Sequence, residues 1–105
     1  MGRVVIVVYR PLKGKEAALE HIVKSHHAVL RQHQFVTSRH PVLMKALDGS
    51  IVEVFEWVSQ EAIERAHTHP VAGQLWEKFG EVCTYEKPVD VNEFHNLFSE
   101  FESVD

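Results

Sequence analysis

The pattern of apolar and polar residues predicts that the chain is built of short strands and amphipathic helices. Residues 3–10 are apolar at both alternating sets of positions, which is typical of a strand covered on both faces. The same property recurs at residues 51–58, where the two sets are Val52, Val54 and Val58, and Ile51, Phe55 and Trp57. Further strands are expected at residues 35–46 and 82–89. Pro41 lacks a backbone donor, so it should place the first of these at a sheet edge or at a bulge.

Three segments show the 3.6-residue period of amphipathic helices. The first spans residues 15–33. The second begins after Ser59, a preferred N-cap residue, and is broken and restarted at Pro70. The third is predicted over residues 90–102, and its apolar stripe consists of Phe94, Leu97, Phe98 and Phe101.

The resulting order is β-α-β-β-α-β followed by a C-terminal helix. This order predicts one α+β domain over residues 1–105 with a ferredoxin-like, four-stranded antiparallel sheet and a core at residues 3–89. Two helices cover only one face of such a sheet, yet the other face is also apolar. We therefore expect a homodimer in which the uncovered sheet faces pack together. The alternative is that the C-terminal helix covers this face within one chain.

Composition narrows the classes of partner and compartment. The 105 residues include 11 Lys and Arg against 15 Asp and Glu, a net charge of -4, which argues against nucleic-acid or anionic-membrane partners. The apolar runs are too short to span a membrane. Cys83 is the single cysteine, so an internal disulfide is impossible and a reducing, cytoplasmic location is expected.

Two segments carry a family resemblance. The run IVEVFEWVSQEAIERAHTHP at residues 51–70, followed by LWEKFGEVCTYE at 75–86, resembles the antibiotic biosynthesis monooxygenases of the dimeric α/β-barrel superfamily. The recurrent part is E-x-F-E-W-x-S-x-E-A leading into a helix. The resemblance in element order covers about residues 3–89. It implies a small-molecule pocket between sheet and helices, and relatives that include cofactor-free monooxygenases, haem-degrading enzymes and isomerases.

The chain also departs from this family at positions that carry chemistry. Cofactor-free members use an Asn with a Trp to hold an oxyanion; here Trp57 is present, but Glu53 stands where the Asn is expected. Haem-degrading members place an axial His late in the second helix, where this chain has Trp76, and an Asn in the first strand, which has none here. The resemblance therefore implies a protein without haem or another cofactor.

His26 is the first candidate for chemistry because it lies in the middle of the apolar face of the 15–33 helix. It is either a base or hydrogen-bonding group in a pocket, or a neutral core histidine bonded to a carbonyl. Trp57, His67 and Trp76 are expected to shape the same pocket, or, for the aromatic residues, to be simple core.

The remaining candidates are carboxylates and a histidine pair. Glu53 and Glu56 lie on opposite faces of one strand, so one of them meets an apolar layer. Burial raises the pKa of a carboxyl unless the carboxyl is paired. The inward-facing glutamate is therefore either a base in the pocket that contacts the substrate or the partner of an arginine in a salt bridge. Glu53 is the residue expected to contact the substrate. His67 and His69 form H-x-H, but a metal site needs a third converging ligand, for which His26 and Glu56 are the candidates, and the spacing alone predicts no metal.

These patterns lead to two hypotheses. In the first, the protein is a cofactor-independent monooxygenase with His26 as its catalytic base, acting on a small planar phenol or quinol. In the second, it is a non-catalytic dimeric barrel that binds a small molecule or serves in a stress response. The missing Asn favours the second hypothesis.

Overall fold

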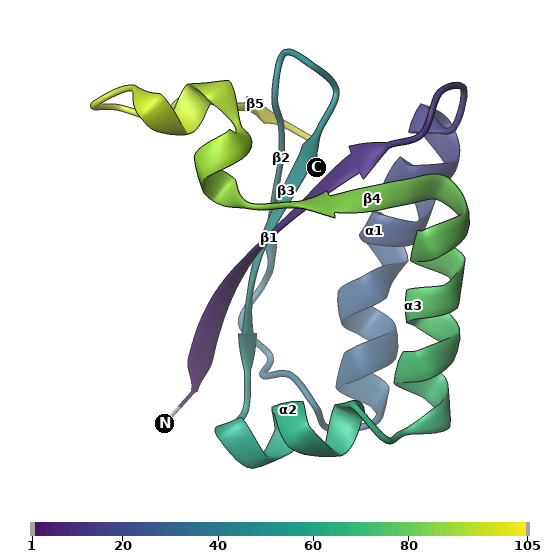
Figure 1. Ribbon diagram of the computed structural model, residues 1–105. Helices are drawn as coiled ribbons and strands as arrows, with labels where there is room; N and C mark the ends of the chain where they lie inside the picture. Colours follow the sequence, from purple (N-terminus) through teal and green to yellow (C-terminus); the bar gives the residue numbers. More distant parts are fainter. Residues whose placement is uncertain (1, 105) are drawn as a thin grey trace.

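A computed structural model describes residues 2–104 of the chain. Within these residues the fold is α+β, with three α-helices and a five-stranded sheet of order β4-β1-β3-β2-β5, in which every neighbouring pair is antiparallel. The strands are β1 (Arg3–Pro11), β2 (Val42–Lys45), β3 (Ile51–Trp57), β4 (Cys83–Glu86) and β5 (Glu102–Ser103). The helices are α1 (Glu16–Gln32), α2 (Gln60–Ala66) and α3 (Pro70–Val82). Figure 1 shows α1 and α3 side by side on one face of the sheet, with α2 across one end.

The helices begin and end close to where the periodicity places them. Ser59 caps α2, and its hydroxyl accepts a hydrogen bond from the Ala62 backbone at 3.1 Å. The break at Pro70 is confirmed: α2 ends at Ala66, His69 is extended, and α3 starts at the proline. The His69 ring caps the new helix by accepting a bond from the Val71 N–H at 3.1 Å. None of the helices in the described part of the chain is long and apolar enough to cross a membrane.

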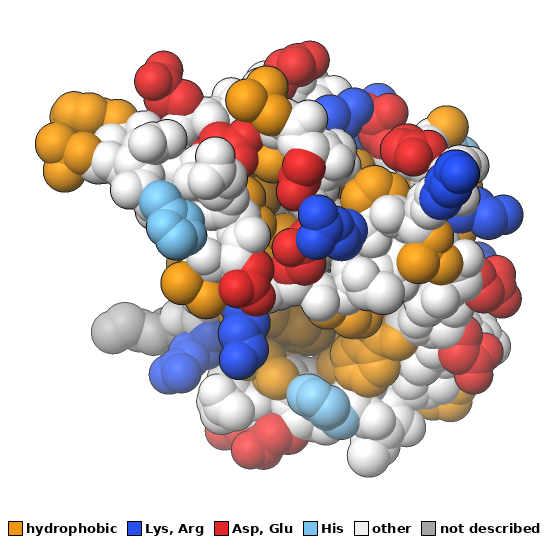
Figure 2. Space-filling model, turned by 45° about the horizontal axis from the view of Figure 1, so that its top comes forward, with side chains coloured by type: hydrophobic (Ala, Val, Ile, Leu, Met, Phe, Trp, Pro, Cys, Tyr) orange, Lys and Arg blue, Asp and Glu red, His pale blue; other side chains and the backbone are white. Residues whose placement is uncertain are grey.

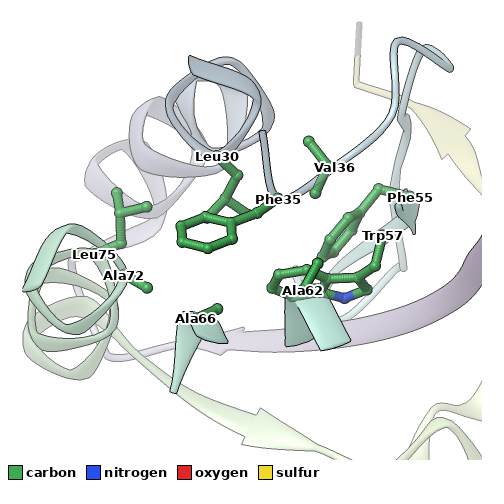
Figure 3. Packing of buried hydrophobic residues seen from close by; sticks show 9 residues of the cluster. All are labelled: Leu30, Phe35, Val36, Phe55, Trp57, Ala62, Ala66, Ala72 and Leu75. Carbon is green, nitrogen blue, oxygen red and sulfur yellow. The ribbon is translucent and has the colours of Figure 1, made fainter. Parts of the chain in front are cut away.

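The helix-facing side of the sheet forms the main core. Phe55 and Trp57 project from β3 towards the end of α1 and the small residues of α2 and α3 (Figure 3). Ala62, Ala66 and Ala72 let the short helices approach the sheet closely. A second cluster, under the first half of α1 and the end of α3, contains Tyr9, Leu19, Val23, Leu43, Ile51, Phe79, Val82 and Cys83.

Two of the predicted strands are shorter than expected. The 35–46 strand is reduced to Val42–Lys45, which begins directly after Pro41, and Val36 makes only an isolated bridge to Trp57. The 82–89 strand is reduced to Cys83–Glu86 because Pro88 opens a 3-10 turn. Pro41 and Pro88 explain where β2 begins and β4 ends, since proline has no backbone N–H to donate to a neighbouring strand.

The predicted C-terminal helix over 90–102 is wrong. The chain instead forms two 3-10 turns, Pro88–Asp90 and Asn92–His95, and then β5, which pairs with Met44 and Lys45. The sheet therefore has five strands rather than four. An isolated helix of this length pays a high nucleation cost, whereas the free edge of β2 offers backbone partners to an extended segment.

The C-terminal segment covers only part of the second sheet face. Val91, Phe94 and Phe101 pack on Val8 and Val52, which are buried. Figure 1 shows this segment on the side of the sheet opposite the helices. Further along the same face, three apolar side chains stay exposed: Val4 at 61%, Ile6 at 50% and Val42 at 52%. We call these three residues the open patch.

Candidate functional site

A cavity of about 410 Å³ lies between the helices and strands β1, β3 and β4. Its volume is in the range of small-molecule sites. Figure 2 shows a hollow on this side of the molecule whose visible walls are largely hydrophobic. The lining residues are Val5, Val7, Tyr9, His26, Phe55, Trp57, His67, Trp76, Phe79 and Tyr85.

A buried chain of three polar side chains lies at this cavity. The Tyr9 hydroxyl donates to Glu53 Oε1 at 2.7 Å, and His26 Nδ1 lies 3.0 Å from the same oxygen. Glu53 has no exposed surface, and His26 is 4% exposed. Glu53 Oε2 and His26 Nε2 are buried and have no hydrogen-bond partner within the described residues.

Strand register and helix period bring these three residues together. Glu53 on β3 pairs with Val7 on β1, so Tyr9 is its diagonal neighbour on the same face of the sheet. On α1, His26 shares the buried face of Leu19, Val23 and Leu30. The helix packs against the sheet at the point where the carboxylate projects, and the imidazole meets it.

Tyr9 stays a proton donor in this environment. Burial raises the pKa of its hydroxyl well above the usual value, and the charge of Glu53 and the hydrogen bond to it raise the pKa further. Tyr85 also lines the cavity, and burial first, then Cys83 and Glu53, raises its pKa to about 12. Both phenols are therefore neutral around pH 7.

Aromatic rings hold the site in place and form its walls. Phe79 stacks on Tyr9 with ring centroids 4.6 Å apart and planes 8° apart. The edge of the His26 ring meets Phe55 and Phe79 at 5.6 and 5.1 Å. The rings of His67 and Trp76 lie 5.4 Å apart. These contacts restrict the imidazole to one orientation beside an aromatic surface.

The structure brings most of the predicted site residues to one place. His26, Trp57, His67 and Trp76 all line the cavity. Glu53 lies behind His26 rather than in the wall, where its carboxylate bonds to Tyr9 and His26. Sequence reasoning assigned no role to Tyr9. The available signal was a tyrosine on the helix-facing side of a buried strand, because a buried phenol needs a polar partner.

The other candidates have structural roles. Glu56, on the opposite face of β3, accepts bonds from Arg39 Nε at 3.1 Å and Thr37 Oγ1 at 3.0 Å. The Arg39 guanidinium, followed by the Thr37 hydroxyl, lowers the pKa of this carboxyl. His67 Nδ1 bonds to the Ile63 carbonyl at 2.7 Å, while His69 caps α3. Among residues 2–104, no group of three or more His, Cys, Asp or Glu side chains is placed to hold a metal ion.

The same chain was compared with known proteins. No family model, no curated protein and no solved structure matches it. The geometry of the cavity and of the buried polar chain is therefore the basis for a functional proposal.

Proposed function

We propose that the cavity binds a small, neutral, planar molecule of the phenol or quinol class. Most of the lining side chains are aromatic, and flat rings pack well against such walls. The cavity lining contains no Lys, Arg, Asp or Glu side chain, so a charged ligand would lose its hydration without gaining an ion pair. The lining residues that carry polar groups include His26, His67 and Tyr85.

The proposed reaction is cofactor-independent monooxygenation with His26 as the base. His26 Nε2 accepts the proton of a quinol hydroxyl, and the electron-rich anion then reacts with molecular oxygen. One oxygen atom enters the ring and the other leaves as water, so a hydroquinone becomes a hydroxyquinone. All electrons come from the substrate, so the balance needs no further reductant. The observation that carries this proposal is the unpartnered Nε2 of a buried histidine at an aromatic cavity.

We further propose that the domain is ferredoxin-like and belongs with the dimeric α/β barrels that the sequence resembles. The strand order β4-β1-β3-β2, with α1 and α3 on one face of the sheet, supports this proposal. The open patch supports a homodimer, because a second copy of the same face would cover Val4, Ile6 and Val42.

One observation favours a second candidate, a barrel that binds its ligand without catalysis. The cavity lining offers no side-chain amide and no fixed cation to hold an oxyanion. Glu53, which stands where the resembled family has Asn, is already occupied by Tyr9 and His26.

Oxygen consumption separates the two candidates. Naphthohydroquinone is the substrate probe, and its spontaneous oxidation is subtracted with protein-free buffer. We expect the wild type to consume oxygen and to form hydroxynaphthoquinone. His26→Gln should remove this activity, whereas His21→Gln, an exposed change on the same helix, should not. In parallel, ligand-observed NMR measures binding of β-naphthol.

Each result assigns the function. Binding of β-naphthol without oxygen consumption above background supports the non-catalytic barrel and rejects the monooxygenase. If the wild type neither binds β-naphthol nor consumes oxygen, the phenol-class proposal is wrong.

A further inference from the structure

Two polar groups from different elements of the fold lie at hydrogen-bond distance from Glu53 Oε1. Tyr9 from β1 lies at 2.7 Å and His26 Nδ1 from α1 at 3.0 Å. Tyr9 donates to this oxygen, and an ionised carboxylate, which is acceptor-only, favours a second donor at His26 Nδ1. No Lys or Arg ion pair to Glu53 is formed within the described part of the chain, so Tyr9 and His26 are its polar support.

We propose that Glu53 is a positioning residue that keeps a proton on His26 Nδ1, so that Nε2 is left as the acceptor nitrogen of a ring that lines the cavity, and that this nitrogen selects ligands that carry a hydroxyl group. The inference rests on the proposed function, since it concerns the same cavity, and it specifies which ligand group the cavity recognises. Glu53 acts through His26 and does not itself contact the ligand.

If the imidazole proton lay on Nε2 instead of Nδ1, the cavity would prefer a different ligand group. If the carboxyl were protonated and donated to Nδ1, the imidazole proton would lie on Nε2, and His26 would donate to a carbonyl or ether oxygen. The Tyr9 contact argues against this arrangement. Tyr9 keeps its proton and donates it to the oxygen that faces His26, which favours a carboxylate there.

Because His26 Nε2 is buried, the position of the imidazole proton affects which ligands bind. His26 Nε2 has neither solvent contact nor a protein partner in residues 2–104. A ligand hydroxyl therefore reaches it through a small displacement of the ring or of its neighbours, and then supplies the missing hydrogen bond. A ligand of the same shape without the hydroxyl leaves the lone pair unpartnered, which is unfavourable in a buried site.

The first experiment measures the histidine tautomer in the ligand-free protein by two-bond ¹H–¹⁵N NMR. We expect His26 to carry a proton on Nδ1, and Nε2 to gain a second one only when the ring is charged. Glu53→Leu, which removes the acceptor at similar volume, should raise the Nε2–H form. Glu53→Gln keeps a carbonyl acceptor and should restore the wild-type pattern. A wild-type spectrum showing Nε2–H with bare Nδ1 would overturn the proposal, without bearing on whether the cavity binds phenols.

The second experiment compares β-naphthol with its methyl ether as NMR binding probes. The wild type should bind the phenol about tenfold more tightly, the usual effect of one buried hydrogen bond. Glu53→Leu should reduce this ratio to near one, and Glu53→Gln should keep most of it. Equal binding of phenol and ether by the wild type contradicts the proposed selection. Absence of binding by both probes contradicts the proposed function instead, and the tautomer measurement then decides the role of Glu53 alone.

Discussion

Single residues in this protein owe their chemistry to burial. The clearest example is Tyr9, which is 1% exposed, stacks on Phe79 and donates to a carboxylate that has no contact with solvent. Its hydroxyl could not be left without a partner at this depth, and neither could Glu53. Tyr9, Glu53 and His26 therefore depend on one another for stability, and any chemistry at His26 depends on the other two residues.

Tyr9→Phe tests this dependence. The change removes the hydroxyl and keeps the ring stack, so the free energy of unfolding should fall by about 1.5–3 kcal/mol, the range for a hydrogen bond to a charged group. Tyr85→Phe is the matched control, because Tyr85 is 54% exposed and its loss should be within about 0.5 kcal/mol. Urea unfolding at pH 7 measures both. Equal, small losses in the two variants would mean that the Tyr9–Glu53 contact adds nothing to stability.

The buried thiol of Cys83 should make the free energy of unfolding fall at alkaline pH. Burial raises the pKa of its thiol from 9.0 to about 11, so the unfolded chain loses this proton first as the pH rises. Because the pKa of Cys83 is higher in the folded state, the contribution of its thiol to the free energy of unfolding is fully present below about pH 9 and declines between about pH 9 and 11. The decline amounts to roughly 2–3 kcal/mol by the usual conversion.

Cys83→Ala isolates that contribution, because the variant lacks the titrating thiol. Thermal unfolding from pH 7 to 11 should fall less steeply for the variant than for the wild type. Tyr9 and Tyr85, whose pKa values are also raised, add to the alkaline loss in both proteins. Cys83 contributes to raising both phenol pKa values, so the variant also loses that part of the alkaline effect. Parallel curves for the two proteins would contradict the assignment to Cys83.

Among the elements, the C-terminal segment shows the largest difference between expected and observed structure. Its apolar residues do not form one helical stripe: Phe94 and Phe101 pack on each other, with ring centroids 5.0 Å apart, and on the sheet. Leu97 and Phe98 are 94% and 79% exposed. The segment therefore contributes to the core through its two ends and not through its tip.

Phe101→Ala and Phe98→Ala form a matched pair for this element. Phe101→Ala should destabilise the protein by about 1–3 kcal/mol, less than a fully buried Phe because it is only partly buried. Phe98→Ala should change stability by less than about 0.5 kcal/mol in the monomer. Thermal and urea unfolding measure the difference. A larger loss from Phe98→Ala would mean that its ring is covered in solution, in the chain or in an assembly.

At the scale of the whole molecule, the two faces of the sheet are covered unequally. Helices cover one face, and the C-terminal segment covers Val8 and Val52 on the other but leaves the open patch. Burying several exposed aliphatic side chains gains about 25 cal/mol for each Å² removed from water, which favours association. Val52 has no exposed surface, so Val52→Asp would disrupt the fold rather than report on assembly.

Ile6→Lys is the sharper test of the homodimer. Ile6 is 50% exposed in the single chain, so the substitution should leave the folded monomer intact but place a charge in the proposed interface. Sedimentation should give about twice the 12.1 kDa chain mass for the wild type and the single mass for the variant. Val89→Lys, at 63% exposure outside the sheet, is the control that should stay dimeric. A wild type that sediments as a monomer removes the dimer proposal.

The sequence alone determined the features that depend on local periodicity. Runs that are apolar at both alternating sets of positions predicted β1 and β3, the 3.6-residue period predicted α1 and the inward position of His26, and the proline predicted the helix break at Pro70. The pocket itself was expected from the family resemblance, and Trp57, His67 and Trp76, which were expected to shape it, all line the observed cavity.

Only the tertiary structure decided what depends on register and on long-range pairing. Tyr9 and Glu53 are 44 residues apart, and their contact follows from the β1–β3 register, which no local pattern encodes. The C-terminal segment followed a helical pattern, yet the free edge of β2 offered it backbone partners that an isolated short helix lacks. Local periodicity fixes which side of an element faces inwards, whereas strand pairing decides which inward residues meet.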